Sequence, residues 1–258
     1  MEVAYKWSAL GSVLVLLMPV LALAAVDSSV PVTVTVDVSR AEPDRMTLLW
    51  RFRLAPDWHL YAPFRNDTGF APSIDLELPD GWSAEDLAWP APERWLVAGE
   101  ILDHVYHHEL ALLQSVRVPL GTAPRRVPAT LRWLACSEIC VPGDTTMTLM
   151  LPAPADTSVG HLAALAAASV PAAMPSSRYS VRRDPGHLVI QAPGASRLTF
   201  VPGIDGPLFG DLAAAGAADA EELTLQFQPG PESTTPLRGL LTIIDTDGRR
   251  TVGWITIP

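Results

Sequence analysis

Lysine is almost missing from this chain of 258 residues. Lys6 is the only one, and every strongly basic side chain after it is an arginine. The remainder of the chain therefore cannot form a lysine Schiff base or supply the lysine of a P-loop. Three further motifs are also absent: Gly-x-Ser-x-Gly, Gly-x-Gly-x-x-Gly and His-Glu-x-x-His. The sequence thus lacks the usual signatures of serine hydrolases, dinucleotide-binding proteins and zinc proteases.

Positive charge is scarce as well, and the formal net charge is −10. Nucleic acids are recognised by basic patches, so an acidic chain of this kind argues against a nucleic-acid partner. We therefore expect no nucleic-acid partner.

Long apolar runs are missing except near the N-terminus, where residues 9–22 are apolar and follow the basic Lys6. Ala22-Leu23-Ala24 has the small-x-small form that signal peptidase recognises. We therefore expect residues 1–24 to be a cleaved signal peptide, with a retained membrane anchor as the alternative. The rest of the protein should then reach an oxidising compartment, where a disulfide can persist.

Cysteine occurs only twice, at Cys136 and Cys140. Apolar, β-prone residues flank the pair, and Pro142-Gly143 supplies turn chemistry directly after it. We interpret the stretch as a tight bend between two antiparallel strands, with one cysteine at each side of the bend. Facing residues on such strands have Cα atoms about 4.5–5.5 Å apart, which suits a disulfide. A cross-link over so short a loop contributes about 2 kcal/mol or less, which favours a chemical use of the pair.

Short segments of alternating apolar and polar residues, separated by Pro and Gly turns, recur along the chain. They cover residues 30–38, 46–54, 74–78, 105–118, 127–135, 188–190, 198–200, 223–227, 237–244 and 251–257. This pattern predicts an all-β fold that starts with an immunoglobulin-like β-sandwich.

A change in composition marks a domain boundary after residue 153. We expect the sandwich to cover residues 27–153 and a second, smaller β domain to cover residues 178–258. Residues 154–177 form the linker, in which Ser158 can cap a short helix over residues 158–169.

The cysteine pair allows three interpretations. It can be a redox-active dithiol, for which Arg132 and His59 would offset the unfavourable charge of Glu138 on a thiolate. It can be a structural staple. It can also join a copper or zinc site, with further ligands from the set His104, His107, His108, Met147 and Met150.

An ordered set of short motifs resembles the periplasmic N-terminal domain of the DsbD and ScsB family of thiol–disulfide interchange proteins. The set comprises 58–61 (WHLY), 89–94 (WPAPER), Gly99 with 106–109 (YHHE), and 136–142 (CSEICVP). The resemblance covers about residues 31–152, and residues 179–258 resemble more faintly the second β domain of the ScsB branch. The sequence departs from the family in lacking transmembrane and thioredoxin-like domains.

The resemblance implies a periplasmic thiol–disulfide exchange protein whose hairpin carries the redox pair Cys136 and Cys140 and which needs no cofactor. Its partners would be a separate membrane or periplasmic thiol–disulfide reductant and oxidised periplasmic proteins. A loop over residues 92–99 would cover the cysteines through Trp95, with His59 and Tyr61 lining the site. The alternative is a non-enzymatic binding or copper-linked module with a structural disulfide.

The resemblance also implies that Cys140 attacks the partner and that Cys136 resolves the mixed disulfide. Pro142-Gly143 bends the chain directly after Cys140, whereas apolar residues precede Cys136. We therefore expect Cys140 to lie nearer the surface than Cys136.

Overall fold

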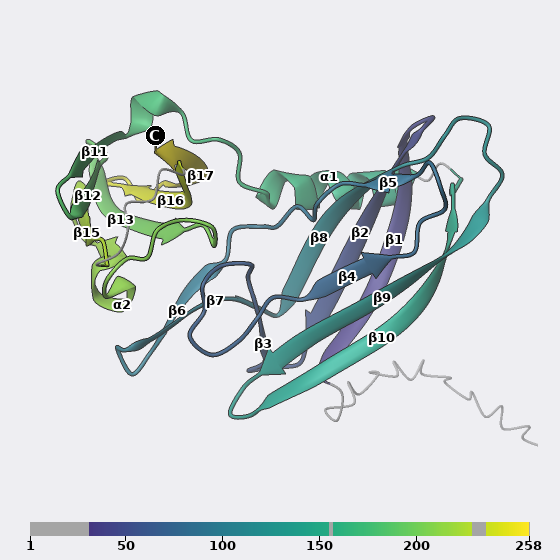
Figure 1. Ribbon diagram of the computed structural model, residues 1–258, viewed down its shortest axis with the longest axis horizontal. Coiled ribbons are helices and arrows are strands. Elements are labelled where there is room, and N and C mark those ends of the chain that lie inside the picture. Colours follow the sequence, from purple (N-terminus) through teal and green to yellow (C-terminus); the bar gives the residue numbers. More distant parts are fainter. Residues whose placement is uncertain (1–30, 155–156, 229–235, 258) are drawn as a thin grey trace, which may run out of the picture.

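The computed structural model describes residues 31–154, 157–228 and 236–257 (Figure 1). The expected signal peptide over residues 1–24 lies outside these ranges. In the described residues, no helix has the length and apolar character needed to cross a membrane.

Two antiparallel sheets form the first part of the chain, which we call the first sandwich. One sheet has the strand order β1-β2-β8-β5, and the other has the order β10-β9-β3-β7-β6, with β4 paired to β9. Their bounds are β1 Val32–Glu42, β2 Arg45–Leu54, β3 His59–Tyr61, β4 Ser73–Leu76, β5 Ser83–Ala84, β6 Glu93–Val97, β7 Ile101–His107, β8 Glu109–Arg117, β9 Arg125–Cys136 and β10 Cys140–Leu151.

Alternation along the strands builds the core between these sheets. On β2, Met46, Leu48, Trp50 and Phe52 are completely buried, and on β9 the alternate residues from Val127 to Trp133 are buried. These inner faces pack on each other, while the intervening residues point outward. The predicted immunoglobulin-like β-sandwich is confirmed.

Strand β7 ends where the chain crosses from one sheet to the other. His108 separates β7 from β8 and has a φ of 65°, a left-handed conformation that interrupts a strand. The sequence allows one strand or two over residues 105–118, and the segment is two strands, because β7 and β8 belong to different sheets. Side chains on either side of this break therefore enter different layers of the sandwich.

The linker contains a helix, as expected, but this helix packs on the first sandwich. Helix α1 spans Thr157–Ser169 and contacts β1, β2 and β8. Ser158 falls within these bounds, and its role as the cap stays a prediction, because its side chain lies outside what the structure describes. A short 3₁₀ helix, η1 Ser176–Arg178, follows.

The remaining strands form what we call the second β unit. Its sheets have the orders β11-β12-β15 and β14-β13-β16-β17, and its core contains Leu188, Phe200 and Leu241. The bounds are β11 Ser180–Asp184, β12 His187–Gln191, β13 Ala195–Pro202, α2 Leu212–Ala215, β14 Ala217–Ala218, β15 Glu222–Gln226, β16 Leu237–Asp245 and β17 Arg250–Ile257. The domain boundaries at residues 153 and 178 stay predictions, and the described sheets fall on either side of them.

The long β9–β10 ladder depends on close packing of Gly143 against Trp133. The two residues face each other in the register, and a Cβ added at Gly143 would overlap the indole ring of Trp133. That ring cannot move freely, because it is buried against Phe52 at a centroid distance of 6.0 Å.

We therefore expect Gly143→Ala to lower the free energy of unfolding by about 1–3 kcal/mol through overpacking. Urea unfolding measures the change. Gly160→Ala in α1 is the matched control, because its added methyl would meet Ser39 Oγ at an ordinary 3.6 Å. The control should raise stability by about 0.5–1 kcal/mol. Equal unfolding midpoints for Gly143→Ala and the unaltered protein would contradict this account of the ladder.

Candidate functional site

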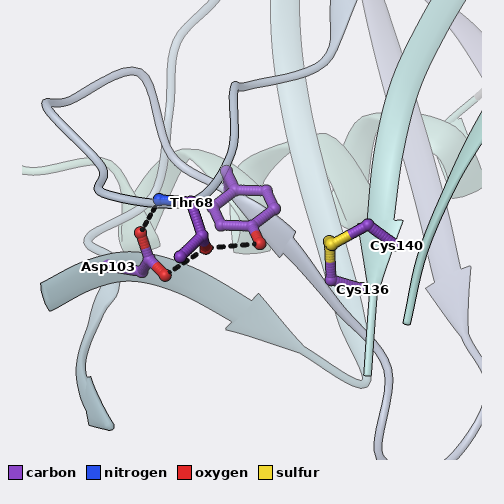
Figure 2. Close-up of a disulfide and its surroundings, with 5 residues drawn as sticks. Thr68, Asp103, Cys136 and Cys140 are labelled. Carbon is purple, nitrogen blue, oxygen red and sulfur yellow. Dashed lines mark hydrogen bonds between the residues drawn. A yellow bond between two sulfur atoms is a disulfide. The ribbon is translucent and has the colours of Figure 1, made fainter. Parts of the chain in front are cut away.

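The cysteine hairpin has the predicted form. Strand β9 ends at Cys136, β10 begins at Cys140, and the two residues face each other in an antiparallel register. A disulfide joins them, with Cα atoms 4.1 Å apart (Figure 2). The bend between them is held by a hydrogen bond of 2.9 Å from the Ser137 N–H to the Ile139 carbonyl. The pair can therefore open and close without rearrangement of the strands.

The two cysteines differ in exposure. Cys136 is 2% exposed and packs with Tyr61, Val105 and Leu134, whereas Cys140 is exposed. The predicted contrast in exposure is confirmed. A sulfur nucleophile must be reached by its partner, so this geometry gives the two cysteines unequal access to another protein.

A row of side chains crosses the sheet beside the disulfide. Cys140 faces Cys136, Cys136 faces His59, and His59 faces His107 in the registers of β10, β9, β3 and β7. Side chains of facing residues lie on the same face of a sheet. The His59 and His107 rings are 5.6 Å apart, and His107 Nδ1 lies 3.1 Å from a carboxylate oxygen of Glu93. The row therefore links the enclosed sulfur to an exposed carboxylate.

Burial lowers the pKa of His59 below its usual value, and the nearby His107 lowers it further, while Asp103 acts in the opposite direction. His59 is consequently neutral at pH 7, and a neutral imidazole can accept a proton.

Beside this row, on the same face of the sheet, a chain of hydrogen bonds anchors the loop 62–72 between β3 and β4. Thr68 Oγ1 donates to Asp103 Oδ2 at 2.6 Å, so the Tyr61 hydroxyl, 2.9 Å away, donates to Thr68. The backbone N–H groups of Asp67 and Thr68 donate to Asp103 Oδ1 at 2.8 and 3.1 Å. Figure 2 shows this chain of hydrogen bonds beside the disulfide.

Sequence reasoning missed Thr68 and Asp103. The available signal was a carboxylate inside the apolar strand segment 101–106, since a buried carboxylate requires donors. Burial, the largest effect, raises the pKa of Tyr61, so its hydroxyl stays protonated as a donor at neutral pH.

The segment expected to cover the site as a loop is instead β6 and its turn into β7. The Trp95 ring lies 4.8 Å from the His107 ring and 6.4 Å from the His59 ring, measured between centroids. It is 41% exposed, so it forms an outer wall of the site. Trp95, His59 and Tyr61 are thus brought together beside Cys136.

An open pocket of about 500 Å³ lies between the β6–β7 hairpin and the tip of the cysteine hairpin. Its lining is Asp57, Trp58, His59, Glu93, Trp95, Val97, His107, His108, Ser137 and Glu138. Both His107 and His108 reach it, because the left-handed backbone of His108 removes the strict alternation of a strand. The pocket is large enough for a side chain of another protein.

Two sequence-based suggestions are not supported by the geometry. Arg132 lies four residues from Cys136 along β9, about 13 Å at the usual strand rise, and it pairs with Asp75 at 2.9 Å. His104 faces the opposite side of β7 from His107, so it does not join the thiols. In the part of the chain that the structure describes, no cluster of three or more His, Cys, Asp or Glu could hold a metal ion.

Comparisons with known proteins give one family match and a similar fold. The family model described as "Thiol:disulfide interchange protein DsbD, N-terminal" matches residues 27–152. The solved N-terminal periplasmic domain of ScsB from Proteus mirabilis is 20% identical, with a TM-score of 0.64, covering 90% of this chain and 96% of that one. The reduced N-terminal domain of DsbD from Neisseria meningitidis is 18% identical, with a TM-score of 0.31, covering 45% and 84%. No curated protein matches the sequence.

The buried His104, on the side of β7 away from the disulfide, predicts a pH dependence of stability. Burial lowers the pKa of His104 from 6.5 to about 4, against a smaller opposing effect of a hydrogen bond with the Arg65 carbonyl. Between these values the unfolded chain binds the proton and the folded chain does not. The free energy of unfolding should therefore fall by up to about 3 kcal/mol as the pH drops from 6.5 to 4.

We expect His104→Gln to flatten this slope in urea unfolding at pH 7, 5.5 and 4.5. His59 adds a smaller slope of the same sign, so some dependence should remain. The control is His161→Gln on the exposed side of α1, which should keep the full slope. An unchanged slope in His104→Gln would refute the assignment.

Proposed function

Because the family model of the DsbD N-terminal domain matches residues 27–152, we propose that this protein exchanges disulfides with other proteins through Cys136 and Cys140. The observation that carries the proposal is the unequal disulfide, with one enclosed and one exposed sulfur at the open end of a rigid β ladder. Exchange needs an accessible attacking thiolate and a second thiol close enough to resolve the mixed disulfide. This pair meets both needs.

Cys140 begins the reaction of the reduced protein. Its thiolate attacks one sulfur of the partner's disulfide, forms a mixed disulfide, and releases the partner's other sulfur as a thiolate. The Cys136 thiolate then attacks Cys140 Sγ. The Cys136–Cys140 bond forms, the bond to the partner breaks, and the partner's second sulfur leaves as a thiolate that takes a proton. Two electrons thus pass to the partner.

His59 receives the proton of the Cys136 thiol in this scheme. It faces Cys136 in the register and is neutral at pH 7 because burial lowers its pKa. An acceptor is needed because Cys136 is enclosed by Tyr61 and Val105, and an apolar setting disfavours the thiolate. His107 and Glu93 extend the proton path toward solvent.

Trp95 and Tyr61 shield the disulfide from adventitious thiols. Trp95 forms the outer wall over the histidine row, and Tyr61 packs against Cys136 on the same face of the sheet. A partner that docks at the pocket would contact Trp95 while it approaches the exposed Cys140. Shielding of this kind limits exchange to proteins that fit the surface.

The protein would act in the periplasm as an oxidoreductase-type electron relay. The signal-like N-terminal segment and the family support this location. A separate membrane or periplasmic thiol–disulfide reductant would regenerate the dithiol, and oxidised periplasmic proteins would accept its electrons.

Replacing one cysteine at a time tests the scheme. Reduced Cys136→Ser should form a lasting mixed disulfide through Cys140, because the resolving thiol is absent. Cys140→Ser should trap at least about tenfold less, because Cys136 is enclosed. The probe is a small thiol–disulfide protein with one of its two active-site cysteines replaced, activated as a mixed disulfide with an aromatic thiol. A non-reducing gel shows the covalent complex.

The double variant Cys136→Ser/Cys140→Ser gives the background of the assay. Stronger trapping by Cys140→Ser would reverse the assignment of the attacking cysteine while exchange itself survives. Absence of trapping with both single variants would favour a binding module with a structural disulfide.

A further inference from the structure

The two faces of the β6–β7 hairpin contact different parts of the protein. Adjacent residues of a strand point to opposite sides of a sheet, so Arg94 and Trp95 on β6 face away from each other. Trp95 lies over His107 beside the disulfide. Arg94 reaches the second β unit, where its Nη2 donates to the carbonyls of Leu212 and Ala213 at 3.0 and 2.6 Å. One short strand therefore contacts both the site and the second unit.

The acceptors of Arg94 belong to α2, a single helical turn. The Leu212 carbonyl also accepts the Gly216 N–H at 2.9 Å, so Arg94 adds a second donor to it. A guanidinium supplies several donors in a rigid fork and stays charged in proteins. The contact joins β6 to α2 by a pair of charge-assisted hydrogen bonds.

A second contact holds the loop 62–72, which lies on the other side of the site. Arg65 Nη2 donates to the carbonyls of Ile204 and Gly206 in the second unit at 2.7 and 2.9 Å. Phe64 stacks on Trp254 of β17 at 5.8 Å and an interplanar angle of 25°. The same loop carries Thr68, which holds Tyr61 beside Cys136.

The outer part of the hairpin makes few contacts of its own. Leu96, Val97 and Ile101 are each about 40% exposed, at 39, 42 and 39%, and the turn contains Ala98 and Gly99 with positive φ. Strand β6 is also an edge of its sheet. Figure 1 shows the second unit beside the β6 and β7 end of the first sandwich, where it can support this edge.

We propose that the second β unit is a brace that holds Trp95 over His107 and His59 at the wall of the pocket, with Arg94 as the positioning residue that transmits this hold. Release of the Arg94 contact lets the hairpin swing outward and opens the pocket side of the disulfide, where Cys136 is enclosed. The second unit thus sets how often the disulfide can be reached, without contributing an atom to the exchange. This inference rests on the proposed function only in taking the disulfide as the reactive group.

The test uses the full chain and the rate at which dithiothreitol reduces the Cys136–Cys140 disulfide, followed by alkylation and mass measurement. Arg94→Met keeps much of the packing of the side chain but removes the donors. We expect it to accelerate reduction about fivefold and to leave the equilibrium reduction potential unchanged, because the brace controls access only. Arg53→Met is the matched control, since Arg53 forms an exposed ion pair with Glu109 on the other sheet.

A double-mutant cycle separates the brace from a general loosening of the fold. In a Trp95→Ala background the cover is already gone, so Arg94→Met should add no further acceleration. Additive acceleration in that background, or an Arg94→Met rate equal to that of the unaltered protein, would overturn the proposal. If Arg94→Met does not fold, Arg94→Lys keeps the charge without the fork and should give a smaller acceleration that Trp95→Ala likewise abolishes.

These rates distinguish the brace from the proposed exchange function. Dithiothreitol reports access to the disulfide whether or not any protein partner reacts with it. If the brace exists but the protein exchanges no disulfides with partners, Arg94→Met accelerates reduction by dithiothreitol, whereas Cys136→Ser forms no mixed disulfide. If exchange occurs without a brace, Cys136→Ser forms the mixed disulfide, whereas Arg94→Met leaves the reduction rate unchanged.

Discussion

The antiparallel register of β9 and β10 is the constraint on which the site depends. The ladder runs from Leu151 opposite Arg125 to Cys140 opposite Cys136, and it places both sulfurs on the outer face of the sheet. A slip of one residue would move one cysteine to the core face. The core face of β9 is fully packed, so the fold itself resists such a slip. The cysteine pair is thus positioned by the sandwich core and not by the disulfide, which adds little stability over so short a loop.

The surroundings give the two sulfurs different chemistry. Cys136 lies in an apolar layer that disfavours its thiolate, while His59 opposite offers a neutral proton acceptor. Cys140 is exposed, where a partner can approach it. Tyr61 helps to enclose Cys136, and Trp95 lies over the neighbouring His107. In the proposed scheme, accessibility more than charge decides which sulfur reacts first.

Much of the fold could be predicted from the sequence, because alternating apolar residues and Pro–Gly turns are local signals. The cysteine hairpin could be predicted equally well, since both cysteines lie in one short stretch between β-prone segments. Strands β3 and β6 are short, and each pairs with β7, which follows both in the chain. Their pairing therefore has no local signal in the sequence. The buried bonds of Thr68 to Asp103 and the reach of Arg94 to α2 join residues far apart in sequence. No local pattern encodes such contacts.

The reduction potential of the Cys136–Cys140 pair tests the central claim most directly. Equilibrating the purified protein with glutathione buffers of graded ratio, followed by acid quenching and alkylation, gives the fraction of dithiol at each poise. A relay must be reducible and oxidisable by its partners, so the account predicts a reduction potential above about −300 mV. Structural disulfides usually have potentials below that value. A pair that stays fully oxidised in strongly reducing buffers would contradict the account and identify the disulfide as a structural staple.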